Sequence, residues 1–199
     1  MLKIENLSFG YSKNNLVLRQ LRMELKKGEL LAIMGPSGCG KSTLLRLIGG
    51  FLSPSSGTLQ INAKKISYAF QEPRLFPWLS VEENLQAVLT KNANASDIQD
   101  ALRFVELEYA AELYPDELSG GMQSRVSLAR ALLYGGDLFL LDEPFSALDQ
   151  ELAKTLAIGL REKLKEMGAS AILVTHQAEV AELFADQILR MDQAVNLTN

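Results

Sequence analysis

The sequence predicts an α/β fold with a mostly parallel core sheet, an N-terminal antiparallel β-subdomain and an inserted α-helical subdomain. Three observations support this prediction. Short apolar runs alternate with helical segments, as in parallel sheets that are covered on both faces. Strands near the N-terminus instead alternate apolar and polar residues, which is typical of an antiparallel sheet with one solvated face. Between about 72 and 123, the apolar spacing becomes helical.

Composition limits the class of protein. The chain has 199 residues, 47% of them apolar, and a net charge of −4, which gives no support to a nucleic-acid partner. No apolar run reaches the length of a membrane span, so we expect a chain that does not enter a membrane by itself. The single cysteine excludes an internal disulfide and suits a reducing cytoplasm.

Most strands and helices can be placed from their patterns. The alternating strands are Leu2–Phe9, Leu21–Leu25 and Thr58–Asn62. The expected core strands are Leu30–Met34, Ile66–Phe70, Leu138–Asp142, Ala171–Thr175 and Gln187–Met191. Helices are expected over Ser42–Ile48, over about Asp149–Met167, and over a segment that ends at Phe184. The first two are stopped by Gly49 and Gly168.

The helical insertion has its own start signals. Ser80 and Glu83 form a capping box, and Asp97–Leu107 is a second amphipathic helix. Ser119 caps a helix that runs to about Leu133. We therefore assign 72–123 to a helical subdomain, and 1–71 with 124–199 to the core and its β-subdomain.

A phosphate-binding loop of the pattern G-x-x-x-x-G-K-[ST] lies between an expected strand and an expected helix. Its glycines let backbone N–H groups approach phosphate oxygens, and the helix N-terminus adds unpaired donors. Its lysine supplies a charge to the outer phosphates, and its serine hydroxyl suits Mg²⁺. A glycine-rich turn without a ligand is the alternative. The loop comprises Gly35, Pro36, Ser37, Gly38, Cys39, Gly40, Lys41 and Ser42.

Polar residues follow the expected core strands, and the carboxyl ends of such strands gather at one edge of the sheet. Asp142 is the expected Mg²⁺ partner of Ser42, and Glu143 suits a general base or a residue that positions the attacking water. His176 is expected to contact the γ-phosphate and orient that water, and Gln71 to bind Mg²⁺ or water. Taken singly, each of these residues also fits a turn or the surface.

Two further features bear on nucleotide binding. Tyr11 is placed to stack on a base, although a half-buried strand aromatic is the simpler interpretation. The string Leu118–Gln123 places Ser119, Gly120 and Gly121 at a helix start, which is a second anion-binding site. One triphosphate does not need two such sites in one chain. Two chains packed head to tail would use both.

These motifs together resemble the ATP-binding subunit of an ABC transporter. They comprise the Walker A loop, followed by Thr43, and the Walker B strand with its carboxylates. They also include the signature Leu118–Gln123 and a D-loop at Ser146–Asp149. Gln71 matches the Q-loop, His176 the switch histidine and Tyr11 the adenine-stacking aromatic. The resemblance implies Mg²⁺-dependent ATP hydrolysis in a sandwich dimer. Ser119, Gly120 and Gly121 of one subunit would then meet the γ-phosphate held by the other.

The segment Gln71–Val81 resembles the nitrate, sulfonate and taurine group of importers. That resemblance implies separate integral-membrane permease subunits, a solute-binding protein, and a peripheral place on the cytoplasmic face of the membrane. An ATPase serving a lipoprotein or peptide exporter stays open as the alternative. A soluble phosphate-loop kinase would not need the signature, and soluble ABC proteins of translation or repair carry two cores or long insertions.

Overall fold

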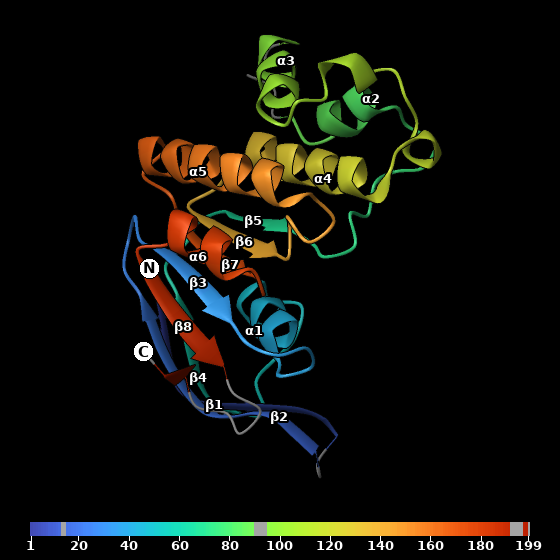
Figure 1. Cartoon of the computed structure of the whole chain (residues 1–199). Helices are drawn as coiled ribbons and strands as arrows, with labels where there is room; N and C mark the ends of the chain where they lie inside the picture. Colours follow the sequence, from blue (N-terminus) through green and yellow to red (C-terminus); the bar gives the residue numbers. More distant parts are fainter. Residues whose placement is uncertain (13–14, 90–94, 192–196, 199) are drawn as a thin grey trace.

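The computed structural model describes residues 1–12, 15–89, 95–191 and 197–198 (Figure 1). Its strands are β1 (Leu2–Ser12), β2 (Asn15–Leu25), β3 (Leu30–Met34), β4 (Ser56–Ile61), β5 (Ile66–Ala69), β6 (Leu138–Asp142), β7 (Ser170–Val174), β8 (Gln187–Met191) and β9 (Leu197–Thr198). Its helices are α1 (Lys41–Ile48), α2 (Val81–Gln86), α3 (Ala95–Phe104), α4 (Gly120–Tyr134), α5 (Gln150–Glu166) and α6 (Ala178–Phe184). Short 3₁₀ turns occur at Glu108–Ala110 and Pro115–Glu117.

The N-terminal strands form the expected antiparallel sheet, in the order β2-β1-β4. Leu2 lies opposite Leu25 on one side and Ile61 on the other. Alternation along these strands buries Leu2 and Ile4 and leaves Lys3 and Glu5 exposed. Both β1 and β2 are longer than predicted, because their outer ends continue to pair up to Ser12 and Asn15 despite several irregularities in register.

The core sheet has the strand order β5-β6-β7-β3-β8-β9. Its first five strands are parallel, and β9 joins β8 in the antiparallel sense. Every residue of β6 and β7 is buried, which explains why these strands read as unbroken apolar runs rather than alternating ones. The expected α/β class is therefore confirmed.

Alternation along the core strands separates two apolar layers. Leu138 and Leu140 face α1 and the antiparallel sheet, whereas Phe139 and Leu141 face α5, α6 and part of α4. Helix α1 thus lies between the two sheets, and the longer helices cover the other face of the core sheet (Figure 1).

The helical part packs around a third cluster that includes Val81, Leu102 and Val126. The capping box of Ser80 and Glu83 is present, as predicted. Helix α2 ends at Gln86, short of the apolar positions that suggested a longer helix, because its last bonds tighten into a turn. Helix α3 ends three residues earlier than expected, at Phe104. The subdomain boundaries at 71/72 and 123/124 stay a prediction.

None of the helices in the described part of the chain is both long enough and apolar enough to cross a membrane.

Asp186 ties three parts of the core together at the edge opposite the phosphate loop. Its carboxylate accepts hydrogen bonds from the Leu30 N–H at 2.9 Å, from Arg161 at 2.7 Å and from Lys165 at 2.5 Å. Burial raises the pKa of Asp186, but the bonds from Lys165, Leu30 and Arg161 together hold it below its usual value. A carboxyl whose pKa is lower in the folded state stabilises the fold above its unfolded pKa and loses that effect in acid.

We predict that Asp186→Asn lowers the free energy of unfolding at pH 7 by about 1–2 kcal/mol, because charge-assisted bonds become neutral ones. The deficit should persist down to about pH 4 and shrink at lower pH, where the wild-type carboxyl also becomes protonated. Urea unfolding at several pH values measures this. Glu162→Gln, an exposed position on α5, removes the same charge and should leave stability unchanged. A deficit that is independent of pH would contradict the role of the charge.

Candidate active site

The strand order brings the predicted site residues to one edge of the core sheet. Strand β7 lies between β6 and β3, so the segments that follow these three strands are neighbours. At these ends lie Asp142, the last residue of β6, with Glu143 after it, His176 after β7, and the phosphate loop after β3. The carboxyl edge of an open parallel sheet is where ligands bind in such folds.

The phosphate loop owes its shape to glycines at fixed points. Gly40, just before α1, has a φ of 104°, in the region where only glycine is unstrained. Gly35 passes so close to the Met191 carbonyl that a Cβ would lie 2.3 Å from that oxygen. No side chain caps the start of α1, so the amides of its first turn are available to an anion.

Lys41 is buried to 8% exposure and holds the loop closed upon itself. Its ammonium donates to the carbonyl oxygens of Gly35 at 2.7 Å and Pro36 at 3.0 Å. Both of these partners are neutral carbonyls, and a phosphate oxygen would be a stronger partner for the ammonium. The loop therefore fits an oligophosphate such as that of ATP.

Ser42 and Asp142 meet across the loop, with the hydroxyl donating to the carboxylate at 2.9 Å. Asp142 is 2% exposed, and this burial raises its pKa above the usual value. The hydrogen bond from Ser42 opposes that shift, while the charge of Glu143 adds to it. One hydroxyl and one carboxylate suit a Mg²⁺ ion that keeps several waters and takes phosphate oxygens as further ligands. The described residues contain no cluster of three or more His, Cys, Asp or Glu side chains that could hold a metal ion.

Glu143 turns away from Asp142 and bonds to His176 instead. Its φ of 53° takes the chain out of the strand, and its N–H donates to the Val174 carbonyl at 3.0 Å. The Glu143 carboxylate lies 2.8 Å from His176 Nδ1. The sequence indicated that the two carboxylates would face different partners. It did not indicate that Glu143 and His176 would form a pair.

Tyr11 and Gln71 stand at the margins of this group. The Tyr11 ring is 63% exposed, and its hydroxyl lies 3.2 Å from the Thr43 hydroxyl, which places the ring beside the start of α1. Phe9 supports it in an edge-to-face contact at 5.1 Å. Gln71 is exposed just beyond β5, and within the described residues no hydrogen bond joins it to Ser42 or Asp142.

The structure does not bring the signature to the phosphate loop of the same chain. Ser119 caps α4, with its hydroxyl accepting from the Met122 N–H at 3.2 Å. Gly121 packs against Ala147, and a Cβ there would lie 2.7 Å from the Ala147 oxygen. Helix α4 belongs to the face of the sheet opposite α1, as Figure 1 also shows. Ser119, Gly120 and Gly121 are therefore separated from Lys41 and Ser42 by the core sheet.

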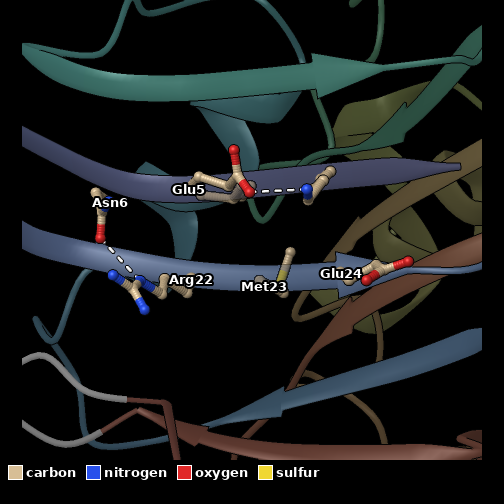
Figure 2. A pocket seen from close by; sticks show the side chains of 7 residues that line it. Glu5, Asn6, Arg22, Met23 and Glu24 are labelled. Carbon is tan, nitrogen blue, oxygen red and sulfur yellow. Dashed lines mark hydrogen bonds and ion pairs between the residues drawn. The ribbon is translucent and has the colours of Figure 1, made fainter.

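A hollow of about 580 Å³ over β1 and β2 is unrelated to this site (Figure 2). Three of its charged side chains have partners within it. Lys3 pairs with Glu5 at 2.7 Å, and Arg22 donates to Asn6 at 2.8 Å. This surface holds no residue that the sequence assigned to chemistry.

Residues 18–146 match the protein family described as ABC transporter, and they include the phosphate loop, the signature and the carboxylate pair. The chain belongs to this family. Its class as an ATP hydrolase follows from that membership.

Several curated relatives of this ABC protein are import ATP-binding proteins. The chain is 39% identical over 185 residues to the aliphatic sulfonates import ATP-binding protein of Bacillus subtilis, covering 88% of this chain and 72% of the relative. It is 38% identical to the taurine import ATP-binding protein of Roseobacter denitrificans, covering 96% and 77%. It is 37% identical to the spermidine/putrescine import ATP-binding protein of Nitratidesulfovibrio vulgaris, where it covers 92% of this chain but spans only 55% of the relative.

Solved structures of an ABC cassette have the same fold. The ATP-binding cassette MJ0796, in a dimeric post-hydrolysis state bound to ADP and Pi, matches with a TM-score of 0.88 and 29% identity. The match covers 100% of this chain and 97% of that one. A second dimeric structure of the same cassette matches with a TM-score of 0.87 and 30% identity.

We predict that Asp142→Asn leaves the nucleotide-free protein as stable as the wild type or more so. Asparagine keeps the size and the acceptor for Ser42 but removes a charge that burial opposes. A carboxyl with a raised pKa destabilises the fold above that pKa, so the difference from wild type should shrink as pH falls. Thermal unfolding without ligand measures this.

The same variant should bind MgATP about tenfold more weakly or worse, since it loses a charged oxygen ligand, while ATP in EDTA binds as before. Asp116→Asn, an exposed position, is the matched control. A clear loss of stability in the nucleotide-free Asp142→Asn protein would mean that this carboxylate is structural.

Proposed function

We propose that this chain drives the import of a solute through a membrane ABC transporter, by binding and hydrolysing ATP in a head-to-tail dimer. The separation of the phosphate loop from the signature by the core sheet carries this proposal, because a second copy would bring its signature to the open side of the loop. The dimeric cassette structures of similar fold support it.

Nucleotide binding is assigned to the loop and α1. The amides of Pro36 through Thr43 surround the phosphates, and Lys41 exchanges the Gly35 and Pro36 carbonyls for phosphate oxygens. Tyr11 stacks on the adenine, beside Thr43. Bound Mg²⁺ supplies neutralisation of the charge that develops on the phosphate oxygens. Ser42 and Asp142 would hold it, with Gln71 as a further ligand.

Hydrolysis is assigned to Glu143 and His176. Glu143 accepts a proton from a water molecule as the water oxygen attacks the γ-phosphorus. The bond from that phosphorus to the β,γ-bridging oxygen breaks, and ADP leaves with the bonding electrons. His176, held at 2.8 Å from Glu143, orients this carboxylate and offers its other ring nitrogen to the γ-phosphate. Ser119, Gly120 and Gly121 of the second subunit donate to the γ-phosphate from the opposite side.

The segment that follows Gln71 is the proposed docking surface for a permease subunit. Trp78 is 70% exposed, and its ring centroid lies 5.6 Å from that of Phe76. This loop is nevertheless rigidly built. The buried Asn84 side chain bonds to Phe76 and to the Leu79 and Ser80 carbonyls, and Arg130 donates to the Pro73 carbonyl at 2.7 Å. Exposed aromatic rings on a fixed loop are typical of a protein interface.

The three relatives described above support import over export, since each is an import ATP-binding protein. Their solutes are aliphatic sulfonates, taurine and spermidine/putrescine, and their identities to this chain are similar. The choice of solute is therefore assigned to the permease and a solute-binding protein. The chain itself would lie peripherally on the cytoplasmic face of the membrane.

We predict that Glu143→Gln binds ATP normally but lowers kcat at least about 100-fold, because the general base is lost. With hydrolysis blocked, the ATP-bound variant should form a stable dimer, measured by light scattering after size exclusion. Glu182→Gln, exposed on α6, should behave as wild type. A Glu143→Gln chain that stays monomeric at saturating ATP would contradict the sandwich dimer.

Mixing two defective chains tests whether the site is shared. Both chains carry Glu143→Gln. In one chain Lys41→Ala should remove ATP binding, and in the other Ser119→Arg should prevent closure of the dimer while leaving the phosphate loop intact. A dimer of one chain of each kind keeps one intact loop facing one intact signature. It should therefore retain one ATP after gel filtration, although neither variant alone retains any. Failure of the mixture to retain ATP would show that the signature does not complete a partner's site.

A further inference from the structure

A separate pocket of about 300 Å³ borders the start of the phosphate loop. It is formed where the adjacent strands β7, β3 and β8 end. Its lining comprises Met34, Gly35, Pro36, His176, Arg190 and Met191. The pocket therefore shares His176 and the first two loop residues with the catalytic site, but none of the Mg²⁺ ligands assigned above.

Arg190 is the charged residue that distinguishes this pocket. Leu189 and Met191 of β8 face the layer of α1, so the alternation of the strand turns Arg190 to the other face. Arg190 lies opposite Met34 in the parallel register, at the end of the strand that leads into the loop. It is thus on the side of β3 away from Ser42 and Asp142.

The pocket is electrically positive and offers several donors. No carboxylate lines it, and among the described residues Arg190 has no hydrogen bond or ion pair with another side chain. His176 uses Nδ1 for Glu143, which leaves Nε2 for a ligand. A guanidinium fork and an imidazole are groups that recognise tetrahedral oxyanions. Since one water occupies about 30 Å³ of liquid volume, the pocket has room for such an anion with part of its hydration shell.

We propose that this pocket receives the orthophosphate released by hydrolysis, with Arg190 as its main ligand. The proposal rests on the proposed ATPase function, because hydrolysis supplies the anion beside His176 and Pro36. Arg190 then draws phosphate to the face of the sheet opposite the Mg²⁺ ligands. ADP and Mg²⁺ stay behind on the α1 face, so phosphate leaves first and by its own route.

Equilibrium dialysis of the full chain with radiolabelled inorganic phosphate, in saturating MgADP, tests the proposal without requiring turnover. Arg190→Gln should raise the dissociation constant for phosphate about tenfold or more, because it removes a charge-assisted bidentate contact. The dissociation constant of Arg190→Lys should lie between those of the wild type and Arg190→Gln, since lysine keeps the charge but not the bidentate guanidinium. ATP affinity should change less than about twofold in either variant, because Arg190 lies on the face of the sheet opposite Ser42 and Asp142.

Lys27→Gln is the matched control. It removes one positive charge from the exposed turn at the other end of β3 and should leave phosphate binding unchanged. Phosphate binding that is equal in wild type and Arg190→Gln overturns the proposal. If Arg190→Gln leaves phosphate binding unchanged but abolishes ATP-dependent dimerisation, the proposal is also overturned. Arg190 would then pair with a carboxylate of the second copy. Absence of ATP hydrolysis by the wild-type chain, also with its permease, would instead overturn the proposed function.

Discussion

Burial of the central strands on both faces is the constraint on which this structure depends. In β6 and β7 every side chain is buried, so polar groups can occur only where these strands end. Asp142, Glu143 and His176 stand at those ends, beside the loop that follows β3. The chemistry is concentrated at one edge of the sheet because the interior of the sheet excludes it.

The same constraint explains why the site is costly to the fold. Asp142 carries a carboxylate with 2% exposure, and its pKa is raised by that burial. Lys41 is also buried, at 8% exposure, and its ammonium donates to two carbonyl oxygens. Neither charge is arranged for the stability of the empty protein. In the proposed function each charge would gain an opposite partner, a cation for Asp142 and an oligophosphate for Lys41, so ligand binding would be coupled to stability.

Much of this could be predicted from the sequence, for identifiable reasons. Unbroken apolar runs predicted the parallel strands, and the glycines around Lys41 predicted the loop, because few residues satisfy those backbone requirements. The pairing of Glu143 with His176 could not be predicted, since it depends on strand order and on a positive φ at a residue that is not glycine. Arg190 was missed for a similar reason. Its strand reads as an ordinary edge strand, and only the register with β3 places it beside the loop. The assignment of Gln71 as a ligand of Mg²⁺ or water stays a prediction.

The contact of Gly121 with Ala147 has a consequence for communication between the two halves of a dimer. Ala147 lies shortly after Glu143 in the sequence. Gly121 packs against the Ala147 carbonyl, and the contact leaves no space for a side chain at Gly121. In the proposed assembly, Glu143 serves one nucleotide while Gly121 serves the other. A shift of the Glu143 segment after cleavage would therefore press directly on the donor group of the opposite nucleotide. This packing contact favours hydrolysis at the two ATP sites in alternation over hydrolysis at each site independently.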